Sequence, residues 1–145
     1  MSTRCNIIVM TEDGDNYQFY HHCDGYPEGV GIELVAMARV AELTTKSNYN
    51  VFAGGRIYSE ELEENFLNII RKSEGYEDEG EIEKPNYNKL HGDIEYLYVV
   101  KINIAGIKVI FREWNGFDDE NDEMAITKLN EGNEAHFNNL SVKIR

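Results

Sequence analysis

Two short apolar runs at the start of the chain, separated by a polar stretch, predict a β-hairpin. Residues 4–10 (RCNIIVM) are almost continuously apolar, as in a buried strand. Residues 11–16 contain an Asp-Gly pair, which favours a tight turn between antiparallel strands. Residues 17–22 (YQFYHH) are rich in aromatic side chains and predict the second strand of the hairpin.

Apolar residues also dominate residues 32–43, where only Glu33, Arg39 and Glu42 are charged. A helix that is apolar around most of its circumference is usually largely buried, so we expect this segment to form a helix packed against a sheet. Residues 48–53 are compatible either with a short strand or with a loop.

A second helix is predicted from Ser59 to Lys72. Ser59 suits the N-cap position, and Gly54 and Gly55 before it are expected to interrupt the chain. The apolar residues follow a helical spacing of i, i+4, i+7 and i+8, which predicts one buried face. They are Leu62, Phe66, Ile69 and Ile70. Gly75 is expected to mark the end of this helix.

The second half of the chain predicts further strands. Residues 74–83 are strongly acidic, and we expect them to form a surface loop. Residues 93–102 and 107–113 (DIEYLYVVKI and IKVIFRE) are rich in β-branched and aromatic side chains, which predicts two strands joined by a turn. Beyond them, residues 124–129 and 137–144 are compatible with two more strands, or with one strand and a helical turn.

This order of elements predicts an α+β fold with a mainly antiparallel sheet and two helices packed on one face. The chain shows no internal repeat and no linker-like stretch, so we expect residues 1–145 to form a single α+β domain. A chain of this length buries enough surface to be stable without disulfides.

The charge balance limits the classes of partner. With 27 acidic against 14 basic residues, the net charge is −13. Such a chain lacks the basic face that direct nucleic-acid binding needs, and it is not attracted to anionic membranes. It contains no apolar run of membrane-spanning length, so we expect a cytoplasmic protein. The acidity either only maintains solubility or serves to contact a basic surface on another protein.

The two cysteines, Cys5 and Cys23, lie in or beside the first two predicted strands. Their spacing suggests neither a metal cage nor a disulfide framework, and a reduced state fits the expected compartment. We therefore predict no metal and no cofactor.

The loop DGYPEGVG at residues 24–31 is the most distinctive local feature, because it places glycines and a proline directly before an apolar helix. Main-chain amides at a helix N-terminus form a natural anion site, and Arg4 or Arg56 would offset the nearby Asp24. The alternative is a tight connection that needs positive φ angles at its glycines. The aromatic strand before the loop supplies either core side chains or a stacking surface.

Three segments, TRCNI at 3–7, DGYPEGVG at 24–31 and HGDIEYLY at 91–98, resemble a family of small proteins encoded largely by phages, prophages and other mobile elements. The resemblance implies a genomic setting and not a chemistry. It implies a phage-encoded accessory protein in the host cytoplasm, of the kind that counters a host defence.

We predict that the protein acts by binding, without catalysis. The expected partner is either a host protein with a basic surface or a small anionic ligand such as a nucleotide, and a homodimer is left open. The predicted ligand-binding residues are Arg4, Tyr20, His22, Asp24, Gly25, Tyr26, Pro27, Gly29, Gly31 and Arg56.

The alternative prediction is a small hydrolase or nucleotide-processing enzyme. Its candidate acid–base residues are His22 with Asp24, or His91 with Asp93. No established catalytic motif supports either pair. The hypothesis requires these side chains to converge in one cleft.

Overall fold

The computed structural model describes residues 3–45, 54–82, 90–114 and 124–125, and it begins with the predicted hairpin. Strands β1 (Cys5–Met10) and β2 (Asn16–His21) are antiparallel, with Ile7 opposite Phe19. Gly14 occupies the turn with φ +89°, a conformation that glycine adopts without strain.

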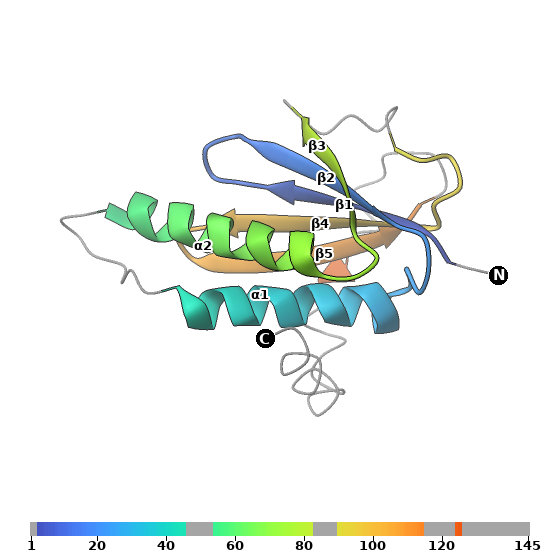
Figure 1. Cartoon of the computed structure of the whole chain (residues 1–145), viewed down its shortest axis with the longest axis horizontal. Coiled ribbons are helices and arrows are strands. Elements are labelled where there is room, and N and C mark those ends of the chain that lie inside the picture. The colour runs from blue at the N-terminus through green and yellow to red at the C-terminus, as the bar shows by residue number, and fades with distance from the viewer. Residues whose placement is uncertain (1–2, 46–53, 83–89, 115–123, 126–145) are drawn as a thin grey trace.

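Strands from both halves of the described chain form one six-stranded sheet in the order β3-β2-β1-β4-β5-β6 (Figure 1). The remaining strands are β3 (Glu77–Ile82), β4 (Tyr96–Asn103), β5 (Gly106–Glu113) and β6 (Met124–Ala125). The central pair, β1 with β4, is parallel, and the other neighbouring pairs are antiparallel. The sheet is therefore mainly antiparallel, as predicted.

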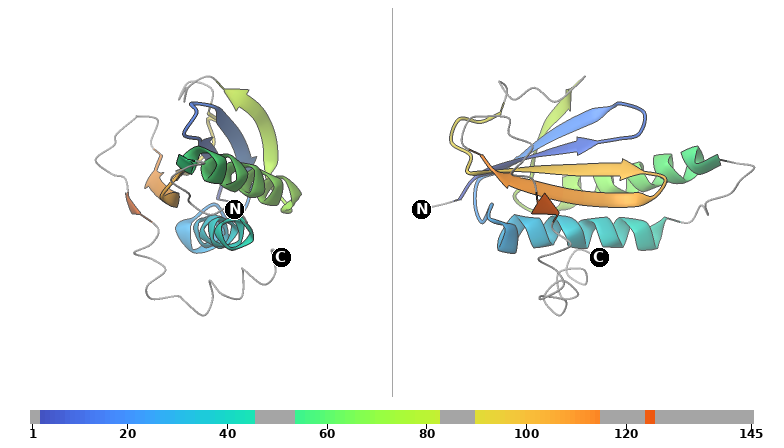
Figure 2. Two further views of the ribbon diagram at one scale, coloured as in Figure 1. Left: turned by 90° about the vertical axis from the view of Figure 1, so that its left-hand side faces the viewer. Right: turned by 180° about the vertical axis from the view of Figure 1, so that it is seen from behind.

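Helices α1 (Ile32–Thr44) and α2 (Gly54–Lys72) lie on the same side of the sheet, as the end-on view in Figure 2 shows. The core between the two layers contains Phe19 from β2, Met37 from α1 and Phe66 from α2, all fully buried. These layers confirm the α+β fold with two helices on one face. The apolar circumference of α1 is explained by its position, because it contacts both α2 and β5.

The start of α2 differs from the prediction. The helix begins at Gly54, so the two glycines do not interrupt the chain, and Ser59 lies buried inside the helix and is not its N-cap. Glycine in a helix costs about 1 kcal/mol relative to alanine. The longer helix offsets that cost because it adds backbone hydrogen bonds and packs Tyr58 against the core. The end of α2 was predicted correctly, with Gly75 at φ +90°.

The acidic segment 74–83 is also different from the prediction, because most of it is the edge strand β3 and not a loop. Its backbone pairs with β2, with Tyr17 opposite Glu81 and Tyr20 opposite Glu77. Nearly all of its residues are exposed, so the strand has no buried apolar positions from which a sequence pattern could reveal it. Charged side chains on an edge strand also hinder unwanted pairing with other chains.

Some predictions concern residues outside the described ranges. These are the ambiguous segment 48–53 and most of the C-terminal segments 124–129 and 137–144, of which only β6 is described. Neither described helix is long and apolar enough to cross a membrane.

Candidate functional site

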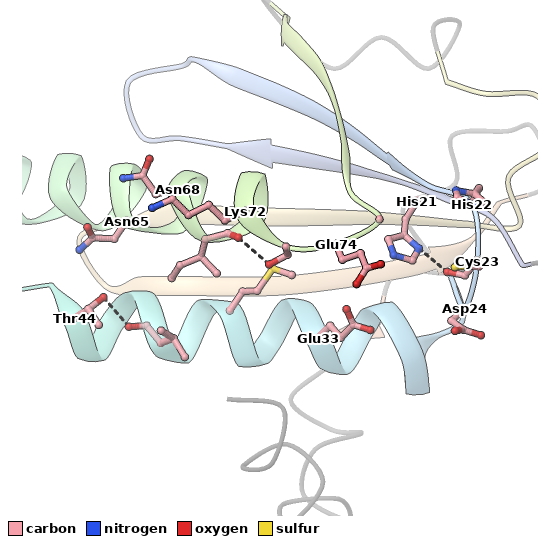
Figure 3. Close-up of a pocket in the computed structure, with 15 residues that line it drawn as sticks. His21, His22, Cys23, Asp24, Glu33, Thr44, Asn65, Asn68, Lys72 and Glu74 are labelled. Carbon is pink, nitrogen blue, oxygen red and sulfur yellow. Dashed lines mark hydrogen bonds between the residues drawn. The ribbon is translucent and has the colours of Figure 1, made fainter. Parts of the chain in front are cut away.

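A groove of about 950 Å³ lies between α1 and α2 and extends to the end of β2 (Figure 3). Met37 and Val40 of α1 and Ile69 of α2 give it an apolar lining. Met37 and Val40 are almost completely buried, so this lining is firmly held by the core. The groove is at the upper end of the volumes typical of ligand sites in proteins.

The two ends of the groove differ in chemistry. Thr44, Asn65 and Asn68 lie at one end, and Figure 3 shows Glu33, Glu74 and the His21 ring together at the other. The first group offers neutral hydrogen-bonding side chains. The second group is acidic, because α1 and the turn after α2 each contribute a carboxylate there.

His21 is 5% exposed, and its imidazole is held in a defined orientation. Its Nδ1 lies 2.5 Å from the main-chain oxygen of Cys23, and because a carbonyl only accepts, Nδ1 carries the proton. The second nitrogen of the ring is Nε2. This atom faces Gly75, where an added Cβ would lie 2.7 Å from it.

Beneath this end of the groove, Tyr76 donates its hydroxyl to Glu33 Oε1 at 3.0 Å. Burial, and secondarily the Glu33 carboxylate, raises the pKa of Tyr76 well above its ordinary value. Burial raises the pKa of the Cys5 thiol in the same way, with a smaller contribution from Glu33. Both groups are therefore neutral at physiological pH, and Cys5 is not an activated nucleophile.

The glycine loop is bonded mainly to its own chain. Residues Pro27–Gly31 form a single π-helical turn (η1) that leads into α1. The amides of Gly25, Gly29 and Val30 donate to the carbonyl oxygens of Thr3, Tyr26 and Asp24, respectively. These three amides are therefore not free to bind an anion.

The glycines of this loop allow two stretches of backbone to pack closely. The positive φ angle in the loop belongs to a residue that is not a glycine. Asp24 has φ +52°, and none of the loop glycines has a positive φ. A Cβ on Gly29 would lie 2.3 Å from Asp24 O, and one on Gly25 would lie 2.9 Å from Thr3 O. The expected positive φ angles at the glycines are therefore wrong, and the glycines are needed because the chain passes so close to itself.

The predicted ligand-binding residues are divided between several places. His22 and Asp24 line the acidic end of the groove. Gly25, Pro27 and Gly31 are buried within the loop, and the exposed Tyr26 donates its hydroxyl to Asp24 Oδ1 at 3.0 Å. Arg56 belongs to α2 by its backbone, but its side chain is outside the described residues.

Arg4 and Tyr20 are not in the groove. Tyr20 alternates with the core residue Phe19 along β2, so it projects from the other face of the sheet. There its hydroxyl donates to Asp93 at 3.3 Å, and Arg4 forms an ion pair with the same carboxylate at 3.2 Å. The structure thus places these two residues together, away from His22 and Asp24.

Among the residues that the structure describes, neither candidate catalytic pair shares a hydrogen bond. His91 stacks on Tyr20, with ring centroids 3.8 Å apart, and its Nε2 contacts Glu79 at 2.5 Å rather than Asp93. His22 and Asp24 line the groove, whereas His91 and Asp93 do not. The four candidate residues therefore do not converge in one described cleft, as the enzymatic hypothesis required.

Sequence reasoning missed Glu33, Glu74 and the apolar lining of the groove. One signal was available, since Glu33 is a lone carboxylate in the first turn of an otherwise apolar helix. Glu74 could not be singled out in this way, because it lies among other acidic residues in segment 74–83. Which helix residues border a groove depends on how α1 and α2 pack, and that packing has no local signature.

Across the residues that the structure describes, no three His, Cys, Asp or Glu side chains are grouped so as to hold a metal ion. Comparison with known proteins finds no matching family model, no matching curated protein and no matching solved structure. The groove itself is therefore the feature of this protein that points to a function.

Proposed function

We propose that this protein is a binding module whose groove between α1 and α2 holds an extended basic segment of a partner protein, without chemical turnover. The observation that carries the proposal is the combination of an apolar lining with a carboxylate-rich end. In the mobile-element setting that the sequence resemblance implies, the partner is a host protein with a basic surface, and binding blocks that surface.

The charges of the groove support a cationic ligand over an anionic one. Asp24, Glu33 and Glu74 are carboxylates, whereas Lys72 is the basic side chain along the described lining. Phosphate-bearing ligands would be repelled at this end, and a basic segment would be attracted to it. The net charge of −13 also attracts a basic partner to the protein before the two come into contact.

The dimensions of the groove suit a short peptide. Glu33 and Thr44 lie at opposite ends of the groove, eleven positions apart along α1. A helix rises about 1.5 Å per residue, so the groove is about 16 Å long, and an extended segment of about five residues spans it. Apolar side chains of that segment would contact Ile69, which is half-buried in the lining, and its main chain would meet the amides of Asn65 and Asn68.

The test measures binding of two fluorescent, end-capped pentapeptides by anisotropy. Both have alternating leucine and alanine, and one ends in lysine while the other ends in glutamate. We expect the lysine peptide to bind in the micromolar range and the glutamate peptide to bind at least tenfold more weakly. Equal affinities, or no binding of either peptide, would overturn the proposal.

A matched pair of variants locates the binding site. Asn68 is exposed and lines the groove, so Asn68→Trp should fill the groove and abolish binding while leaving the core intact. Glu64 is exposed on the same helix but does not line the groove, so Glu64→Trp should bind the peptide like the unmodified protein. Identical binding by both variants would place the peptide elsewhere.

Hydrolysis is a second candidate, favoured by one observation on the other face of the sheet. Glu79 Oε1 accepts hydrogen bonds from the amides of Asn6 and Gln18, and Glu79 Oε2 contacts His91 Nε2. A carboxylate held in this way orients an imidazole as a general base. The test measures the rate at which the protein hydrolyses activated esters. A rate that falls at least tenfold in Glu79→Gln would support this function. A rate no higher than in buffer alone would dismiss it.

A further inference from the structure

Residues 141–145 (SVKIR) of this chain belong to the class of segment that the groove is proposed to bind. Valine and isoleucine alternate in them with lysine and arginine, and none of residues 135–145 is acidic. In an extended segment, successive side chains project to opposite sides, so the apolar pair and the basic pair separate. A strongly acidic chain therefore contains its own basic segment, of the length that spans the groove.

The groove and this segment are complementary in charge. Asp24 and Glu74 are exposed carboxylates of the lining, and Glu33 is a half-buried one. Lys72 is the basic side chain along the described lining. The carboxylates therefore outnumber the cation, and the groove attracts the two basic side chains of residues 141–145.

The groove also offers partners for the other parts of the segment. Ile69 of α2 is half-buried, so part of its side chain is open to contact with an apolar side chain. Asn65 and Asn68 line the groove on the same helix, and their amides both donate and accept hydrogen bonds. An extended main chain has both kinds of group to pair with them.

The chain between the last described residue and this segment is long enough to reach the groove. Residues 126–140 follow Ala125 of β6, and fully extended they span about 50 Å. A domain of this size is about 40 Å across. In addition, β6 pairs with β5, and β5 contacts α1, which forms one wall of the groove. The segment therefore reaches the groove of its own molecule.

We infer that residues 141–145 occupy the groove in the free protein, where their basic side chains meet the carboxylates and their apolar side chains contact Ile69. The inference rests on the proposed function, because it regulates access to the same groove. A tethered segment acts at an effective concentration on the order of 1 mM, so a weak contact suffices to fill the groove. The basic segment of a partner then binds only by displacing residues 141–145.

The affinity for a peptide measures this occupancy. If residues 141–145 fill the groove in about four-fifths of the molecules, about one-fifth are free to bind, and the apparent Kd is about fivefold higher than for an open groove. We therefore expect the double variant Lys143→Gln/Arg145→Gln to bind the lysine pentapeptide about fivefold more tightly than the unmodified protein. Equal affinity of the two proteins would overturn the inference.

Two further double variants separate this contact from a general change of charge. Lys101→Gln/Lys108→Gln removes two exposed positive charges from β4 and β5 that do not line the groove, and it should bind the peptide like the unmodified protein. Val142→Ser/Ile144→Ser keeps the net charge and should tighten peptide binding, because it removes the apolar contact. An equal gain in the Lys101→Gln/Lys108→Gln variant would assign the effect to net charge and overturn the inference.

Paramagnetic broadening in NMR spectra locates the segment directly. A nitroxide on Ser141→Cys, in a Cys23→Ser background, should broaden the side-chain amide signals of Asn65 and Asn68, and excess lysine pentapeptide should restore them. The buried Cys5 does not take up the label. Unchanged signals would overturn the inference. So would broadening in a mixture where the nitroxide and the isotope label are on different molecules, because it would assign the contact to a second copy.

The two proposals fail in different ways. If Asn68→Trp abolishes peptide binding but Lys143→Gln/Arg145→Gln does not tighten it, the groove binds peptides and its occupation by residues 141–145 is wrong. If Asn68→Trp has no effect on binding of the lysine pentapeptide, the groove is not the peptide-binding surface, and the proposed function fails. Salt weakens both contacts, so the salt dependence of peptide binding is measured with Lys143→Gln/Arg145→Gln.

Discussion

At the scale of single residues, the most informative groups are those with a backbone conformation or a pKa that is unusual for their residue type. Asp24 has a positive φ angle that glycines beside it could have adopted more easily. Glu63 of α2 is a carboxylate close to Asp13 and Asp15 of the β1–β2 turn.

The state of Glu63 predicts a pH-dependent stability. Partial burial, and secondarily the neighbouring carboxylates, raises its pKa to about 7 from an ordinary value of 4.5. Because the folded state favours the protonated form, this group disfavours folding progressively as the pH rises from about 4.5 through about 7. We expect Glu63→Gln to raise Tm at pH 8 and to leave it almost unchanged at pH 4.5.

Since Glu63 is partly exposed, we expect a gain of about 1 kcal/mol at pH 8, or about 2–4 °C in Tm. Differential scanning calorimetry at both pH values measures it. Glu64→Gln, at the exposed neighbouring position, serves as the control and should shift Tm equally at both pH values. A larger gain for Glu63→Gln at pH 4.5 than at pH 8 would contradict this account.

At the scale of elements, one buried side chain connects three segments on the face of the sheet opposite the helices. Asn6 of β1 is fully buried. It donates to Phe19 O of β2 at 2.9 Å and to Glu79 of β3 at 3.0 Å, and it accepts the main-chain N–H of His91 at 2.9 Å. It thus fastens the edge strand and the segment before β4 to the centre of the sheet.

We therefore expect Asn6→Ala to lower the free energy of unfolding by about 2–3 kcal/mol, because it leaves several polar groups without partners. Guanidinium unfolding measures the loss, and hydrogen exchange should show that the His91 amide loses protection. Asn103→Ala, at the exposed end of β4, is the control and should cost less than about 1 kcal/mol. A similar small cost for Asn6→Ala would show that the three segments are held by other contacts.

At the scale of the whole molecule, the excess of acidic groups acts in two opposite ways. It produces repulsion within the folded protein, and it attracts basic partners. Salt screens both effects, with a Debye length of about 10 Å at 0.1 M. The stability of the free protein and the affinity of its complex should therefore respond to salt in opposite directions.

Raising NaCl from about 0.05 M to about 0.5 M should increase Tm of the free protein by a few degrees, roughly the effect of 1 kcal/mol. The same increase in NaCl should weaken the binding of the lysine pentapeptide several-fold. Thermal melts and anisotropy titrations in NaCl measure both, and sulfate is avoided because it strengthens apolar burial in general. A Tm that falls with NaCl would contradict net repulsion in the fold.

Much of the fold was predictable because local sequence patterns specify it. Residues close together in the sequence specify three of these features: the Asp-Gly turn, the aromatic strand and the apolar stripe from Leu62 to Ile70. The prediction failed at the start of α2 and at β3, where packing and backbone pairing with distant residues decide the outcome. The candidate site was predictable only at His22 and Asp24, which line the groove beside a distinctive loop.

The sequence by itself determined the hairpin, helix α1, the C-terminal part of helix α2, the α+β layers and the net acidic charge, because these follow from periodicity and composition. Only the tertiary structure decided which polar groups meet. It brought His21, Glu33 and Glu74 to one end of a groove, and it placed Tyr20 and His91 together on the opposite face of the sheet. Such meetings depend on long-range packing between elements far apart in the chain, and no local pattern encodes that packing.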